Sequence, residues 1–91
     1  MKLSRNFPLN GMRVFEAAAR HLSFTRAGEE LGMTQTAVSY QIKLLEEMLG
    51  EPLFLRRPRQ VTLTEAGASL APKVAEAFGL LQEAVANMRE T

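Results

Sequence analysis

The sequence contains no cysteine and no tryptophan, and it has a single histidine, His21. The absence of cysteine excludes a disulfide framework and any thiolate metal site. One histidine cannot build a metal centre by itself. The sequence also shows no glycine-rich phosphate loop and no nucleophile next to a base. We therefore expect no catalytic site, no metal and no cofactor.

Long hydrophobic runs are also missing. No apolar stretch approaches the length of about 20 residues that spans a membrane, and no signal-peptide pattern follows Met1. Hydrophobic residues still make up 46% of the 91 residues, which is enough for one small globular domain with a modest core. These features favour a reducing, cytoplasmic setting without a membrane partner.

The net charge is small, but charged residues are unevenly distributed along the chain. The net charge is +1, yet residues 1–63 hold nine Lys and Arg against six Glu, and residues 64–91 hold two against four. The first part therefore carries a balance of +3 and the second a balance of −2. The basic excess coincides with the polar helix and arginine-rich turn described below, which favours a polyanionic partner there.

Capping residues and breakers divide the chain into helices and a hairpin. Asn10, Ser23, Thr34 and Thr64 are suitable N-caps, and glycines end the second and third predicted helices. The predicted organisation is an arm over residues 1–8, a unit over residues 9–64 with a helix-turn-helix at about 24–43 and a hairpin at about 53–63, and a long helix over residues 65–91. The predicted fold is mainly α.

Glycine at two positions bears on the tight turn between the second and third predicted helices. Gly32 can take the left-handed conformation that such a turn needs. Gly28 lies four residues earlier, inside a helix, where glycine costs roughly 1 kcal/mol relative to alanine. Either a steric demand or simple tolerance explains it.

The third predicted helix opens with uncharged hydrogen-bonding side chains. Gln35 can pair with both N6 and N7 of an adenine, and Thr36 and Ser39 are short enough to allow close approach to bases. Tyr40 and Lys43, further along, suit phosphate or sugar. The alternative is an ordinary solvated helix face, in which Thr34 serves only as a cap.

The predicted hairpin carries three arginines, Arg56, Arg57 and Arg59, near its tip. Three arginines on a surface turn are often merely solvated. A hairpin beside a DNA-reading helix would instead bring them to phosphates or to a minor groove, where arginine is favoured electrostatically.

The long C-terminal helix carries an apolar stripe close to a heptad pattern, which predicts dimerisation through this helix. Its alternative is packing onto the first helix of the same chain, and we expect part of the stripe to do that. The stripe consists of Leu70, Val74, Phe78, Leu81, Val85 and Met88, with Ala77 as an alternative to Phe78.

The run FEAAARHLSFTRAGEELGMTQTAVSYQIKLLEEMLGEPLFLR, followed by VTLTEAG, resembles the N-terminal domain of LysR-type transcriptional regulators. The variant AAARHLSFT is similar to the subgroup of glycine-cleavage and β-lactamase regulators. The resemblance implies a winged helix-turn-helix that binds partly palindromic double-stranded DNA as a dimer through its linker helix. It also implies a separate C-terminal effector-binding domain of roughly two hundred residues, which this chain does not include. A small-molecule effector would act through that domain, and family members often form tetramers at full length.

The resemblance also assigns roles to individual positions. The residues that match base-facing positions are Gln35, Thr36, Ser39 and Tyr40. Those that match phosphate-contacting positions are Ser23, Thr25, Lys43, Thr62 and Thr64, and Arg59 matches a minor-groove arginine of the wing. Two positions depart from the family pattern. Gly28 replaces a usual alanine, and Tyr40 stands where many members carry arginine or histidine, so the family's base preference does not transfer.

A different class of function is a protein-interaction module in which the long helix dimerises and the hairpin is incidental. Salt dependence discriminates the two, because binding to DNA weakens steeply with salt whereas pairing through an apolar seam does not. An enzyme is a poor third hypothesis.

Overall fold

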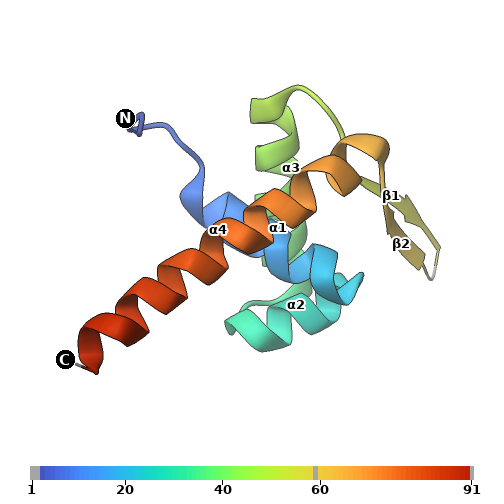
Figure 1. Ribbon diagram of the computed structural model, residues 1–91. Helices are drawn as coiled ribbons and strands as arrows, with labels where there is room; N and C mark the ends of the chain where they lie inside the picture. The colour runs from blue at the N-terminus through green and yellow to red at the C-terminus, as the bar shows by residue number, and fades with distance from the viewer. Residues whose placement is uncertain (1–2, 59, 91) are drawn as a thin grey trace.

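A computed structural model describes residues 3–58 and 60–90, which form four helices and one two-stranded hairpin (Figure 1). The elements are α1 (Leu9–His21), α2 (Phe24–Leu31), α3 (Gln35–Leu49), β1 (Phe54–Arg57), β2 (Gln60–Leu63) and α4 (Glu65–Arg89). The predicted elements are thus confirmed, with ends that differ by one or two residues. No helix in these ranges is long and apolar enough to cross a bilayer.

Three of the four predicted N-caps are confirmed. The hydroxyl oxygens of Ser23, Thr34 and Thr64 each accept a hydrogen bond from a backbone N–H three residues ahead, at 3.0–3.1 Å. The prediction for Asn10 is wrong. Helix α1 begins earlier, because the Pro8 carbonyl already accepts from the Met12 N–H at 2.9 Å. Asn10 lies inside the helix, and its side-chain oxygen accepts from the Arg13 guanidinium.

The turn between α2 and α3 explains why glycine occupies position 28. A Cβ atom at Gly28 would collide with the carbonyl oxygen of Met33. The backbone closes on itself there, since the Met33 N–H donates to the Gly28 carbonyl at 2.8 Å. The glycine therefore answers a steric demand, and alanine would require the turn to move away. Gly32 takes the predicted left-handed conformation, with φ of 70°.

Helix α1 is the centre of the packing. It contacts α2, α3 and α4, and it contributes Val14, Phe15 and Ala18, all fully buried (Figure 1). The hairpin joins this core through Phe54, whose ring centroid lies 5.6 Å from that of Phe15 and 5.2 Å from that of Phe24. Aromatic pairs at these separations stabilise a core beyond the area that they bury.

The first half of helix α4 packs against the domain, and its second half is exposed to solvent. Val74 is buried, and Leu70 and Phe78 pack partly against the core. Leu81 and Met88, by contrast, are 55% and 71% exposed, and the second half of α4 extends beyond the other helices (Figure 1). The expectation that part of the stripe packs within its own chain is confirmed for the first half.

A surface ion cluster ties α1 to α2. The Arg20 guanidinium contacts the Glu16 carboxylate at 2.8 Å and the Glu30 carboxylate at 2.6 Å. The His21 ring lies 2.7 Å from the same Glu30 carboxylate. Hydrogen bonds that the Glu30 carboxylate makes with Arg20 and then His21 lower its pKa to about 2, and the hydrogen bonds that Arg20 donates to Glu16 and Glu30 raise the pKa of Arg20.

We expect this cluster to make a small, pH-dependent contribution to stability. The pKa of Glu30 falls from an ordinary 4.5 to about 2 on folding, so the carboxylate stabilises the fold above pH 4.5 and ceases to do so as the pH falls to 2. Glu30→Gln should lower the free energy of unfolding at pH 7, and the difference from wild type should vanish near pH 2. Urea titrations across that range measure it. Glu29→Gln, which removes a neighbouring carboxylate that makes no ion pair with another described residue, should show no such trend.

Candidate nucleic-acid interface

One surface groove collects predicted DNA-contacting residues that lie far apart in the sequence. It runs between the start of α2, the start of α3 and the hairpin. Its walls consist of Leu22, Ser23, Phe24, Thr25, Gln35, Arg57, Gln60, Val61 and Thr62. The fold therefore brings members of the predicted base-reading, phosphate and wing sets to a single site.

The start of α2 supplies the floor of this groove. The Ser23 oxygen accepts from the Arg26 N–H at 3.1 Å, which leaves the Ser23 hydroxyl proton available to a ligand. Thr25 lies exposed in the first helical turn. Because free N–H groups and the helix dipole make a helix N-terminus favourable for anions, these two hydroxyls are placed to donate to a phosphate.

The first two turns of α3 present the predicted reading edge. Gln35, Thr36 and Tyr40 are exposed, and Ser39 is half-buried. The opposite face is anchored by Val38 and Ile42, which have no exposed surface. The helix is thus fixed by its apolar face while its uncharged polar face stays open.

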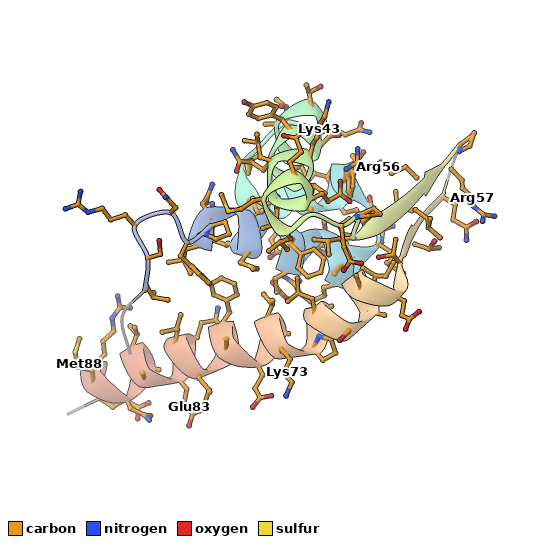
Figure 2. The ribbon with its side chains drawn as sticks, turned by 90° about the horizontal axis from the view of Figure 1, so that it is seen from above. Lys43, Arg56, Arg57, Lys73, Glu83 and Met88 are labelled. Atoms are coloured by element: carbon orange, nitrogen blue, oxygen red, sulfur yellow. The ribbon has the colours of Figure 1, made fainter. Side chains whose placement is uncertain are left out.

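Of the four predicted base-reading residues, Gln35 lines the groove, and Thr36, Ser39 and Tyr40 do not. Tyr40 and Lys43 lie further along α3. Both are exposed, and Lys43 projects from the outer side of α3 (Figure 2). They extend the polar face beyond the groove, at positions suited to the sugar–phosphate backbone on its flank.

The hairpin contributes Arg57 and Gln60, which face each other in the antiparallel register. Both are exposed, and within residues 3–58 and 60–90 the Arg57 side chain makes no hydrogen bond or ion pair. Arg59 lies outside the described residues. Gln60 was not among the sequence-predicted residues, and only its pairing with Arg57 places it at the site.

Two predicted phosphate contacts are engaged inside the protein. The Arg56 guanidinium lies 3.2 Å from a Glu46 carboxylate oxygen and 5.2 Å from the centre of the Phe24 ring. In Figure 2, Arg56 lies beside α3 whereas Arg57 points away from it. The Thr64 hydroxyl donates to the Pro52 carbonyl at 2.8 Å and accepts from a backbone N–H of α4. Since a hydroxyl has one proton, Thr64 cannot also donate to a phosphate in this arrangement.

No cluster of three His, Cys, Asp or Glu side chains suited to a metal ion occurs in the described part of the chain. Among residues 3–58 and 60–90, the carboxylate with a strongly lowered pKa is Glu30, in the ion cluster between α1 and α2, and that cluster lies outside the groove. The chemistry of the groove is therefore that of hydroxyl, amide and guanidinium donors.

Comparison with known proteins identifies the family of this chain. The family described as "Bacterial regulatory helix-turn-helix protein, lysR family" matches residues 9–68. The glycine cleavage system transcriptional activator of Escherichia coli K12 is 57% identical over 82 residues, covering 90% of this chain and 27% of that protein. The transcriptional activator AmpR of Providencia stuartii is 56% identical over 75 residues, covering 82% and 26%. These relatives are activators, in agreement with the predicted subgroup and with a regulator rather than an enzyme.

Solved structures share the fold. The crystal structure of the BenM_DBD/benA site 1 DNA complex superposes with a TM-score of 0.81 at 30% identity, covering 90% of this chain and 92% of that chain. The chain spans about a quarter of the length of the curated relatives it matches.

Two nearby threonines, Thr62 in β2 and Thr64 at the N-cap of α4, test whether a hydrogen-bonded hydroxyl contributes to stability. Thr64→Val removes both hydrogen bonds of the hydroxyl and should lower the free energy of unfolding by about 1–2 kcal/mol, because an N-cap and a carbonyl partner are lost together. Thr62→Val is the matched control, since Thr62 makes no side-chain hydrogen bond with another described residue, and it should change stability by less than about 0.5 kcal/mol. Urea denaturation measures both. Equal losses would mean that the Thr64 hydroxyl contributes nothing specific.

Proposed function

The chain belongs to the LysR family of bacterial regulatory helix-turn-helix proteins, and we propose that it binds double-stranded DNA sequence-specifically as a dimer. The observation that carries the proposal is the groove that joins Ser23 and Thr25 of α2, Gln35 of α3 and Arg57 of the hairpin. Hydroxyl donors, an amide and an unpaired cation along one surface match the contacts that a DNA duplex offers. The similarity to a DNA-complexed relative supports the same partner.

The first turns of α3 enter the major groove in this proposal. Gln35 pairs with an adenine edge, and Thr36 and Ser39 allow the helix to approach closely. Tyr40 completes the reading edge. Because these four side chains carry no charge, their contacts depend on the match with particular bases rather than on attraction to any phosphate.

Phosphates are held on both sides of the reading helix. The sequence predicts phosphate contacts from two sources: the family resemblance gives Ser23, Thr25, Lys43, Thr62 and Thr64, and the arginine-rich hairpin adds Arg56, Arg57 and Arg59. Among these residues, Ser23, Thr25, Arg57 and Thr62 line the groove, which supports them as contacts, whereas Arg56 and Thr64 are engaged within the protein. Arg59 is proposed for the minor groove on the resemblance alone.

Dimerisation is proposed through α4. Leu81, Val85 and Met88 expose apolar surface on the half of the helix that extends beyond the domain. Next to them lies an almost entirely apolar groove between α1 and α4, which Phe7, Leu9 and Met12 line from the N-terminal side and Leu70, Val74, Phe78 and Leu81 from α4. A second copy of α4 provides a matching apolar surface, and a dimer would place two reading helices about 10 base pairs, or a multiple, apart.

The remaining proposals concern the longer protein. The relatives are about three times the length of this chain, so a C-terminal domain that binds a small-molecule effector, and assembly to a tetramer, are proposed from the family. The location proposed is the bacterial cytoplasm, with the protein associated with the nucleoid.

A protein-interaction module is the second candidate, since the exposed stripe of α4 supports pairing with or without DNA. Selection of bound sites from random double-stranded DNA at fixed salt separates the two. DNA binding predicts an enriched, partly palindromic site and an affinity that falls with salt along a log–log slope of about −0.9 per neutralised phosphate. Recovery of no duplex at low salt would leave the interaction module.

Gln35→Ala tests the reading edge. The loss of paired hydrogen bonds to one base should weaken binding to the selected site by about 1–3 kcal/mol and leave binding to random duplex nearly unchanged. Fluorescence anisotropy at one salt concentration measures both affinities. Equal losses on the two duplexes would remove Gln35 from the reading set.

The proposed dimer interface is tested with two adjacent leucines of similar exposure. Leu81 is 55% exposed and lies on the stripe, whereas Leu80 is 60% exposed and lies off it. Leu81→Glu should give monomers in analytical ultracentrifugation, because it places charge in an apolar seam. Leu80→Glu should leave the dimer intact. A dimer that survives Leu81→Glu would place the interface elsewhere.

A further inference from the structure

We propose that Glu46 and Arg56 are positioning residues that fix the hairpin against the reading helix, and that Arg56 does not itself contact DNA. The inference rests on the proposed function, because the geometry that the pair fixes is that of two DNA-contacting elements. It assigns a role to Glu46, and it gives Arg56 a different role from that of its neighbour Arg57.

The first observation is the set of contacts made by one carboxylate. Glu46 lies on α3, and its side chain is 16% exposed. One carboxylate oxygen accepts from the Leu53 N–H at 2.7 Å and from the Phe54 N–H at 3.3 Å. The other accepts from the Arg56 guanidinium at 3.2 Å. Glu46 thereby links α3 to Leu53, which directly precedes β1, and to Phe54 and Arg56 within β1.

The second observation is the position of Arg56 between three elements. Its guanidinium lies over the Phe24 ring of α2 while it contacts Glu46 of α3. The Phe24 ring in turn meets the Phe54 ring edge-on, at 87° and 5.2 Å. Arg56 therefore connects α2, α3 and β1, and its guanidinium combines an ion pair with a cation–π contact.

A consequence for DNA binding follows from charge. The Arg56 charge is compensated by Glu46, whereas Arg57 has no acidic partner among the described residues. Arg57 can thus displace a counterion from a phosphate, whereas Glu46 already neutralises the charge of Arg56, which displaces no counterion while the pair holds. Loss of Arg56 should loosen the hairpin relative to α3 and leave the number of neutralised phosphates unchanged.

Salt titrations distinguish positioning from contact. Arg56→Gln and its matched control Arg57→Gln are compared with wild type on two 30-base-pair probes, a selected site and a random-sequence pool. Arg57→Gln should flatten the log–log salt slope by about 0.9 per bound protomer on both probes. Arg56→Gln should keep the wild-type slope but weaken binding to the selected site about tenfold, the scale of one lost base contact. A slope reduced by Arg56→Gln as by Arg57→Gln would overturn the proposal.

Amide hydrogen exchange tests the same pair without DNA. Glu46→Ala removes the oxygen that accepts from the Leu53 and Phe54 N–H groups, so exchange at these two amides should accelerate by about tenfold or more relative to wild type. Glu47→Ala, which truncates the adjacent exposed glutamate, should leave both rates unchanged. Unchanged exchange in Glu46→Ala would overturn the role of Glu46 as the brace between α3 and the hairpin, and this measurement decides the matter even if Arg56→Gln does not fold. If wild type bound neither probe, the DNA-binding proposal and the positioning role would both fail, whereas the exchange rates would still report the brace separately.

Discussion

The backbone of Leu53 is fixed from both sides, and the relation between the helices and the hairpin depends on it. Its N–H donates to the Glu46 carboxylate of α3, and its carbonyl accepts from the Thr64 N–H at 3.0 Å. Its side chain is buried, and a Cβ at Gly67 of α4 would collide with its carbonyl oxygen. One peptide segment therefore links the reading helix, the hairpin and the start of α4 in a fixed arrangement.

Several arginines are also engaged in contacts within the protein. Arg20 and Arg56 are paired with glutamates of other elements, and Arg13 is bound to Asn10 within its own helix. Arg20 and Arg56 thus hold elements together, and the exposed polar side chains at the start of α3 are uncharged. A domain with net charge +1 has little general attraction for a polyanion, so recognition by such a domain rests on the match of individual donors and acceptors with bases.

What the sequence predicts correctly is mostly local. Ser23 and Thr34 are recognisable as caps because the hydrogen bond spans three residues and needs no tertiary partner. Asn10 failed as a cap because Pro8 offers its carbonyl to the helix first, a competition that residue preferences do not reveal. The role of Glu46 was not visible, since its partners lie seven to ten residues away across a loop. The same holds for the candidate site. The uncharged edge of α3 is legible in the sequence, but its junction with the hairpin requires the fold.

Periodicity has a similar limit on α4. A heptad-like stripe has the same appearance whether it faces its own domain or another copy, and here it does the first from Leu70 to Phe78 and leaves Leu81 onward exposed. Helical rise places Leu81 about 10 Å beyond the buried Val74. The start of α4 is held against α3 through the backbone of Leu53. A partner bound to the exposed half of α4 therefore takes a fixed orientation relative to α3. In the proposed dimer, contacts made far along α4 therefore set the direction in which the proposed reading edge of α3 points.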